Sequence, residues 1–264
     1  MRARLLAVVA LAAVLASATA CGGDDTASAP AGGSSSAGGV RGPITVLAAA
    51  SLTGSFDRIG RDFEAANPQA KVTFSYGGSS GLAQQITSGA PADVFAAASP
   101  ATMKTVTDAG DATGAPATFV KNQLVIAVPK GNPKGITSLA ALAEPEFKVA
   151  LCAEQVPCGA AAAKALAAAN VKLTPVTLEQ DVKAALAKVK LGEVDAALVY
   201  RTDARAAAAE VDGVEFPESA QAINDYPIVA LKDAPNAAGA AAFVSYVRSA
   251  AALKVLTDAG FQQP

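Results

Sequence analysis

Short apolar runs alternate with helical stretches along most of this chain, and this alternation restricts the fold more than any other feature of the sequence. The runs have the length of buried strands, and the stretches between them carry apolar residues at helical spacing. Strands that alternate with helices are typical of a mostly parallel sheet with helices on both faces. In the first half of the chain, the predicted strands are 44–50, 71–76, 92–98 and 123–129, and the predicted helices are 52–66, 80–88 and 101–109.

The alternation restarts after Lys130. We therefore predict an α/β fold of two lobes, each a mostly parallel sheet flanked by helices. The first lobe is expected to contain residues 43–123 and 220–264, and the second residues 124–219, with connecting strands near 124–128 and 214–228. The later predicted strands are 147–152, 194–200 and 226–231, and the later helices are 160–170, 181–191, 237–249 and 251–259.

The first 20 residues resemble a bacterial lipoprotein signal peptide. Arg2 and Arg4 precede an apolar segment of signal-peptide length, and small residues lead up to Cys21. Cleavage would leave Cys21 as a lipidated N-terminus, and residues 21–42 would form a flexible tether rich in Gly and Ser. We therefore expect an extracytoplasmic protein that is lipid-anchored to the outer face of the cell membrane. The alternative is a secreted protein with an ordinary signal peptide.

The composition excludes several kinds of site. The chain has no histidine, which removes Ser-His-Asp and Cys-His catalysis and the commonest transition-metal ligand. It also lacks the Gly-x-Ser-x-Gly and Ser-x-x-Lys motifs of serine enzymes, so we expect no enzyme activity. Its net charge of −2 gives no sign of nucleic-acid binding. Cys152 and Cys158 are six residues apart and could form a disulfide outside the cytoplasm; the alternative is two free buried thiols.

Four strand-to-helix junctions offer uncharged hydrogen-bond donors without any basic side chain. The first amides of a helix have no partner within the helix, and ligands of α/β proteins collect where strands end and helices begin. Each junction alone could be an ordinary cap or turn. Four of them, two in each lobe, predict a site for a small anion. The candidate donors are the hydroxyl and amide of Ser51, the amides of Ser79 and Ser80, the amides of Cys158 and Gly159, and the amide of Val182; we expect Asp181 to cap its helix.

A site made only of donors also selects among anions. Oxyanions of the sulfate and molybdate type carry no proton at neutral pH, whereas phosphate keeps one and needs an acceptor in its site. We therefore hypothesise that such a site disfavours phosphate.

Five segments in this order resemble the extracytoplasmic molybdate-binding proteins of ABC importers, and the resemblance covers about residues 43–261. It implies a two-lobed type II periplasmic binding protein fold, with the ligand in a cleft between the lobes. It also implies a cytoplasmic ATPase and a membrane permease as partners, no cofactor, and a monomer. The segments are ITVLAAASLTGSF, GGSSGLAQQITSGAPADVFAAAS, VPCG, EQDVKAALAKVKLGEVDAALVYRTDA and LTDAGF.

The resemblance implies five contacts with molybdate or tungstate, bound as an oxyanion without a direct metal ligand. Tyr200 is the residue that enters through the resemblance alone, since a strand-end tyrosine could equally cover the core. Gly78 and Gly81 stand where the family more often has Ser or Thr, which is expected to loosen that corner. The five implied contacts are the hydroxyl and amide of Ser51, Ser79, the amides of Cys158 and Val182, and the hydroxyl of Tyr200.

Three alternatives remain open at this stage. The protein could be a receptor for sulfate or another small tetrahedral oxyanion, an enzyme, or an adhesion or structural lipoprotein without a ligand. Molybdate and tungstate have nearly the same size and charge, so the sequence does not separate them.

Overall fold

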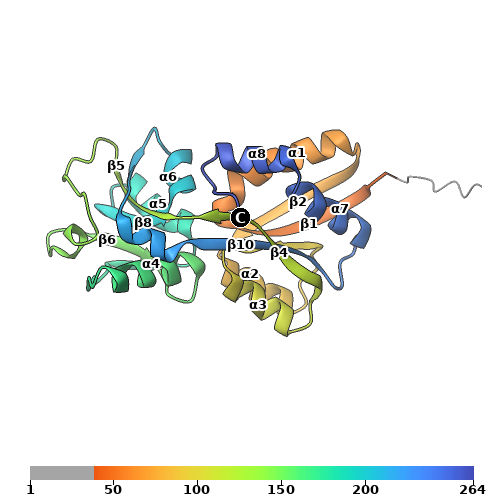
Figure 1. The fold of residues 1–264 in the computed structure, drawn as a ribbon, viewed down its shortest axis with the longest axis horizontal. Coiled ribbons are helices and arrows are strands. Elements are labelled where there is room, and N and C mark those ends of the chain that lie inside the picture. Colours follow the sequence, from red (N-terminus) through yellow and green to blue (C-terminus); the bar gives the residue numbers. More distant parts are fainter. Residues whose placement is uncertain (1–38) are drawn as a thin grey trace, which may run out of the picture. The chain divides into compact units, whose positions relative to one another are not determined.

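The structure, a computed structural model, describes residues 39–264 (Figure 1). The predicted signal peptide, Cys21 and the tether up to residue 38 lie outside the described residues. The first strand, β1 (Arg41–Ala49), contains the last two residues of the predicted tether. Arg41 and Gly42 already pair with the neighbouring strand, opposite Gln69 and Ala70.

The described chain forms two five-stranded sheets with the same pattern of strand directions. In each sheet four strands run one way and the strand next to the edge is reversed. The first sheet has the order β2-β1-β3-β10-β4, with β2 (Gln69–Gly77), β3 (Val94–Ala96), β10 (Asn224–Leu231) and β4 (Ala112–Asn122). The second has the order β7-β6-β8-β5-β9, with β7 (Thr177–Glu179), β6 (Val149–Cys152), β8 (Ala196–Tyr200), β5 (Leu124–Pro129) and β9 (Val211–Val214).

Helices cover both faces of each sheet, as the alternating pattern predicts (Figure 1). We call the first sheet with its helices the first lobe, and the second sheet with its helices the second lobe. The first lobe contains α1 (Thr53–Ala66), α7 (Ala237–Val247) and α8 (Ala250–Asp258) on one face, and α2 (Ser79–Thr87) and α3 (Pro100–Asp108) on the other. The second lobe contains α4 (Pro157–Ala168), α5 (Val182–Lys190) and α6 (Arg201–Ala206).

Strand β1 shows why the first sheet is buried on both sides. Ile44, Val46 and Ala48 belong to the main core, which lies under α1 and α7, whereas Leu47 belongs to a second cluster under α2 and α3. Successive side chains of a strand point to opposite faces, so a continuous apolar run suits a strand that is covered twice.

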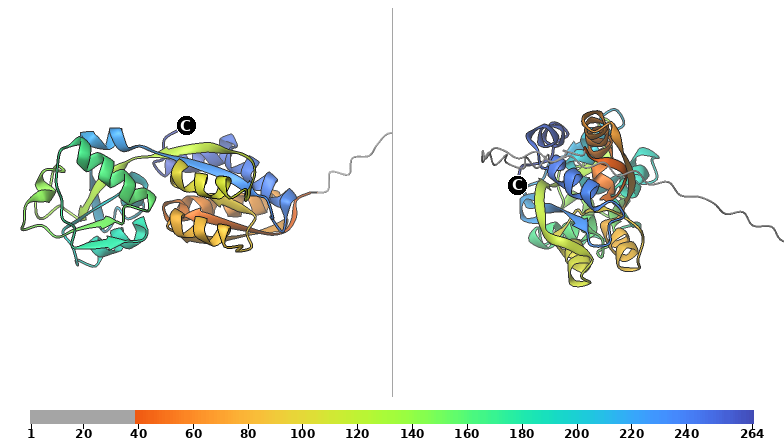
Figure 2. Two further views of the ribbon diagram at one scale, coloured as in Figure 1. Left: turned by 90° about the horizontal axis from the view of Figure 1, so that it is seen from below. Right: turned by 90° about the vertical axis from the view of Figure 1, so that its right-hand side faces the viewer.

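The chain passes between the lobes twice, and the reversed strand of each sheet follows such a passage (Figure 2). Strand β4 of the first sheet leads through Gln123 into β5 of the second, and β9 leads back into β10. Asn122 at the end of β4 pairs with Asn224 at the start of β10. These two asparagines therefore lie where the lobes are joined.

Among the strands and α-helices of the described residues, four were missing from the sequence prediction, namely β4, β7, α6 and β9. Strand β4 contains Gly114 and Pro116, and β10 is the only strand of its sheet beside it. This is the edge position where Gly and Pro are tolerated. The other three have six residues or fewer and show no periodicity. Within residues 39–264 no single helix could cross a membrane by length and hydropathy; the pair α7 and α8, bent by 59°, meets that test only together.

Candidate functional site

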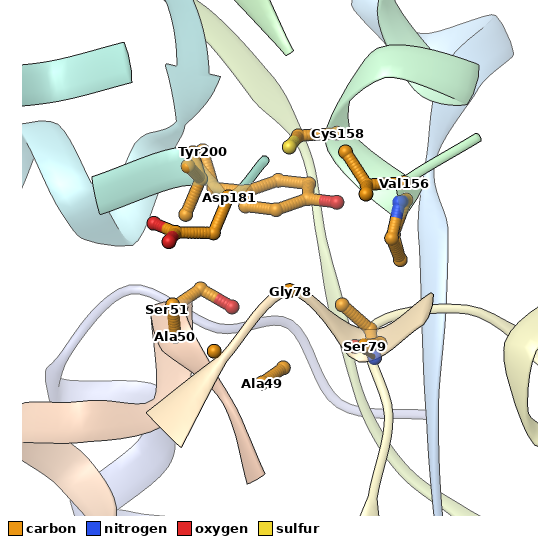
Figure 3. A pocket seen from close by; sticks show the side chains of 13 residues that line it. Ala49, Ala50, Ser51, Gly78, Ser79, Val156, Cys158, Asp181 and Tyr200 are labelled. Carbon is orange, nitrogen blue, oxygen red and sulfur yellow. Dashed lines mark hydrogen bonds between the residues drawn. The ribbon is translucent and has the colours of Figure 1, made fainter. Parts of the chain in front are cut away.

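A small cavity lies between the lobes, at the carboxyl ends of six strands (Figure 3). The strands β1, β2 and β3 contribute from the first lobe, and β6, β7 and β8 from the second. The space open to the centres of water-sized spheres has a volume of about 20 Å³. One water molecule needs about 10–15 Å³ measured in the same way. The cavity therefore suits a compact guest rather than an extended organic molecule. It is lined by Ala49, Ala50, Ser51, Gly77, Gly78, Ser79, Ala98, Val156, Pro157, Cys158, Asp181, Val182 and Tyr200.

All five residues implied by the resemblance line this one cavity. Of the other candidates, Ser80 turns its hydroxyl to the carbonyl of Gln155, 2.5 Å away in the second lobe, and does not line the cavity. Gly159 does not line it either.

Three of the helix starts at the cavity lack a side-chain cap, whereas α5, which also opens onto the cavity, has one in Asp181. Helices α3, α7 and α8 begin away from the cavity, and the side chains of Ser99, Asn236 and Ser249 accept hydrogen bonds from their first turns. The 3₁₀ turn at Ser51 (Ala50–Leu52), α2 and α4 open onto the cavity without a side-chain cap. Their first amides are left to another partner, and the positive end of each helix dipole faces the same space.

Two serine hydroxyls reach the cavity from the first lobe. The Oγ of Ser79 accepts a hydrogen bond from the amide of Ala98 at 3.0 Å. The Oγ of Ser51 lies 2.9 Å from the Oη of Tyr226, and it points into the gap between the lobes in Figure 3. Ser51 therefore does not cap its helix, which was the ordinary alternative for a serine at this position.

The third hydroxyl belongs to Tyr200 at the end of β8. It accepts a hydrogen bond from Nδ2 of Asn224 at 2.8 Å. Burial, reinforced by the neighbouring Tyr226, raises the pKa of Tyr200 well above its usual value. Burial likewise raises the pKa of Tyr226. Both phenols therefore keep their protons throughout the physiological range and can act as donors.

The loop before α4 is held by a disulfide between Cys152 and Cys158, with the two Cα atoms 5.7 Å apart. Gly159 follows directly, and a Cβ at this position would lie 1.9 Å from the carbonyl oxygen of Ala153. The loop is thus folded too tightly for any other residue at 159. These features fix the direction of the Cys158 amide at the start of α4.

Val182 begins α5, and Asp181 caps that helix as predicted, accepting from the amide of Ala184 at 2.9 Å. In Figure 3 the carboxylate of Asp181 points away from the hydroxyl of Tyr200. Next to Val182, the Nζ of Lys183 lies 2.9 Å from the fully buried Asp203, which links the start of α5 to α6. Burial raises the pKa of Asp203, and the ammonium of Lys183 opposes that shift.

The lobes also approach each other closely beside the cavity at Gly78. A Cβ there would lie 2.2 Å from the carbonyl oxygen of Gln180 in the second lobe. At Gly81 a Cβ would meet nothing within 4 Å. Our expectation that both glycines loosen this corner is therefore wrong for Gly78, because the absence of a side chain lets the two lobes meet there.

No lysine or arginine lines the cavity among the described residues. Lys183 and Arg205 line an adjoining cavity that shares only Ser51 with the first. The cavity can therefore neutralise a guest only through N–H and O–H groups and helix dipoles. Sequence reasoning missed three residues behind the hydroxyls, Asn122, Asn224 and Tyr226, because nothing in their spacing relates them to the cavity.

Comparison with known proteins gives one matching family and several relatives. The family model for "bacterial extracellular solute-binding protein" matches residues 44–262. The molybdate-binding protein ModA of Mycobacterium tuberculosis is 44% identical over 221 residues, which cover 84% of this chain and 85% of that protein.

Two solved structures share the fold. The periplasmic molybdate-binding protein of Azotobacter vinelandii is 21% identical, with a TM-score of 0.70, and the match covers 84% of this chain and 99% of that one. The sulfate-binding protein SubI of Mycobacterium tuberculosis is also 21% identical, with a TM-score of 0.71, and the match covers 84% of this chain and 86% of that one. At this identity the two structures bear on the fold alone.

Proposed function

Since this chain belongs to the bacterial extracellular solute-binding proteins, we propose that it binds molybdate and delivers it to the permease of an ABC importer. The choice of molybdate is supported by the mycobacterial relative of that name, at 44% identity over 84% of the chain. Tungstate is a second proposed ligand, because it has nearly the same size and charge.

The observation that carries the proposal is the chemistry of the cavity. Three hydroxyls and the first amides of several helices border one small space without a cationic side chain. Hydrogen bonds to a charged group contribute roughly 1.5–3 kcal/mol each, so a handful offsets much of the desolvation of a dianion. We propose that Ser51, Ser79, Cys158, Val182 and Tyr200 make these bonds.

The same chemistry supports rejection of phosphate. Hydrogen phosphate has a proton to donate, whereas Asp181, the carboxylate in the lining, accepts from the amide of Ala184 and points away from the hydroxyl of Tyr200 in Figure 3. A guest that brings its own proton would leave that proton without an acceptor.

We also propose how the protein is held at the membrane. Cys21 would carry a lipid, and residues 21–38 would tether the two lobes beside the permease and its cytoplasmic ATPase. The Arg-containing start and the apolar segment that precede Cys21 support this. The protein would work as a monomer without enzyme activity, in keeping with a family of solute-binding proteins.

Calorimetric titration with molybdate, tungstate, sulfate and phosphate tests the proposal. We expect tight binding of molybdate and tungstate, weak binding of sulfate and none of phosphate. Binding of sulfate alone, or phosphate as tight as molybdate, would overturn it.

The variant Ser51→Ala tests the assigned site. Loss of one charge-assisted hydrogen bond should weaken molybdate binding by about tenfold to 150-fold, equivalent to roughly 1.5–3 kcal/mol. The melting temperature without ligand should change little, because the substitution removes one hydroxyl and the buried Tyr226 keeps Asn122 as a hydrogen-bond partner. Unchanged affinity would mean that the site lies elsewhere.

A further inference from the structure

Each hydroxyl at the cavity has a hydrogen-bonding group behind it. A hydroxyl has one proton, so if it accepts a bond from behind, its proton is left to point forward. Ser79 accepts from the amide of Ala98, which can only donate. The direction of this bond is therefore certain, and the proton of Ser79 is available to the cavity.

The direction at Tyr200 is fixed by Asn224, which lies where the two lobes are joined. Nδ2 of Asn224 lies 2.7 Å from the carbonyl oxygen of Ala98 and 2.8 Å from the hydroxyl of Tyr200. A carbonyl can only accept, so the atom facing Ala98 must be the NH₂ group. The Tyr200 hydroxyl then accepts from Asn224 and must give its own proton elsewhere.

Ser51 is backed by a longer chain of the same kind. The amide of Gln123 donates to Oδ1 of Asn122 at 3.0 Å, which turns Nδ2 of Asn122 toward Tyr226 at 3.4 Å. Tyr226 in turn lies 2.9 Å from Ser51. If each group passes its proton forward, Ser51 is a donor to the cavity as well.

We propose that Asn224 is a positioning residue that fixes Tyr200 as a donor and thereby sets selectivity for oxyanions without a proton. The proposal rests on the proposed function. Asn224 need not touch the anion, because it acts through Tyr200: by donating to the phenol oxygen, it leaves the phenol proton free to point into the cavity. The same Nδ2 also donates to the carbonyl of Ala98 in the first lobe, so Asn224 fixes the direction of the Tyr200 hydroxyl at the place where the lobes meet.

The substitution Asn224→Asp reverses the arrangement with little change in shape. The oxygen that replaces Nδ2 must carry a proton to donate to the carbonyl of Ala98, and it can then accept the proton of Tyr200, so the phenol oxygen offers the cavity a lone pair instead of a donor. Binding of molybdate should weaken about 10- to 100-fold. Hydrogen phosphate gains an acceptor, whereas sulfate has no proton to donate. The ratio of molybdate affinity to phosphate affinity should therefore fall more than the ratio of molybdate affinity to sulfate affinity.

The experiment is calorimetric titration of the full-length protein with molybdate, sulfate and phosphate at neutral pH. The matched control is Asn236→Asp, since Nδ2 of Asn236 also donates to two carbonyls, those of Arg41 and Pro43, far from the cavity. It should leave the affinity ratios as in the wild type. If Asn224→Asp does not fold, Asn224→Ala should still lower the molybdate-to-phosphate ratio, because Tyr200 becomes free to turn.

A double-mutant cycle with Tyr200→Phe separates this role from a general structural one. Without the hydroxyl, Asn224→Asp should no longer change the ratio of molybdate to phosphate affinity. An equal change of that ratio in both backgrounds, or no change in the wild-type background, would overturn the inference. A wild-type protein that binds no molybdate would instead overturn the proposed function.

Discussion

The substitution Gly78→Ala should push the two lobes apart. The backbone at Gly78 has φ −63° and ψ 127°, which alanine adopts without strain. The only obstacle is the carbonyl oxygen of Gln180, 2.2 Å from the added Cβ, where ordinary contact needs about 3.4 Å. The two segments must therefore separate by about 1 Å.

A separation of this size is large on the scale of hydrogen bonds. A bond of about 2.9 Å that spans the cavity would lengthen to nearly 4 Å and would no longer count as one. Cys158, Val182 and Tyr200 all approach from the lobe that is pushed away. The loss of even one charge-assisted bond costs roughly 1.5–3 kcal/mol, so affinity should fall at least tenfold.

Calorimetry on Gly78→Ala and Gly81→Ala measures this effect with a control in the same loop. At Gly81 the added Cβ meets nothing, so affinity should equal that of the wild type. Because Gly81 lies inside α2, alanine there should also stabilise the protein by about 0.5–1 kcal/mol. If Gly78→Ala bound molybdate as tightly as Gly81→Ala, the argument from lobe contact would be refuted.

Two further predictions concern the loop before α4 and the buried phenols. Replacing Cys152 and Cys158 with alanine should lower the free energy of unfolding by about 2 kcal/mol, because the closed loop is short, and should also weaken molybdate binding. Urea denaturation would measure the first effect and calorimetry the second. Unchanged values would show that the disulfide does not order the loop. Because burial raises the pKa of Tyr200, its contribution to stability should be complete below about pH 10 and be lost as the pH rises further toward the folded-state pKa. Denaturation curves between about pH 8 and 11 would check this, and constant stability above pH 10 would contradict it.

The sequence predicted those parts of the fold that local pattern determines. Long apolar runs and helical periodicity gave the main strands and helices. They also gave Ser51 and Ser79 as donors at helix openings, because a helix start is a local feature. Edge strand β4 was not predicted, because its Gly114 and Pro116 are typical of loops unless the pairing with β10 is known.

The supporting residues could not be found in this way. Asn224 and Tyr200 are 24 positions apart, and Tyr226 and Ser51 are 175 apart. Only the return of the chain from the second lobe to the first brings them together. The same holds for Gly78, whose importance depends on a carbonyl that belongs to the other lobe.

The position of β10 has a consequence for how the protein matures. This strand lies between β3 and β4, so β4 cannot pair with its sheet until residues 224–231 have been synthesised. A chain cut short before that point would expose two unsatisfied strand edges, which are prone to pair with other chains. Productive folding of the first lobe must therefore wait for nearly the entire polypeptide, whereas the second sheet is complete by Val214; truncations before β10 should aggregate through the open edges of the first lobe.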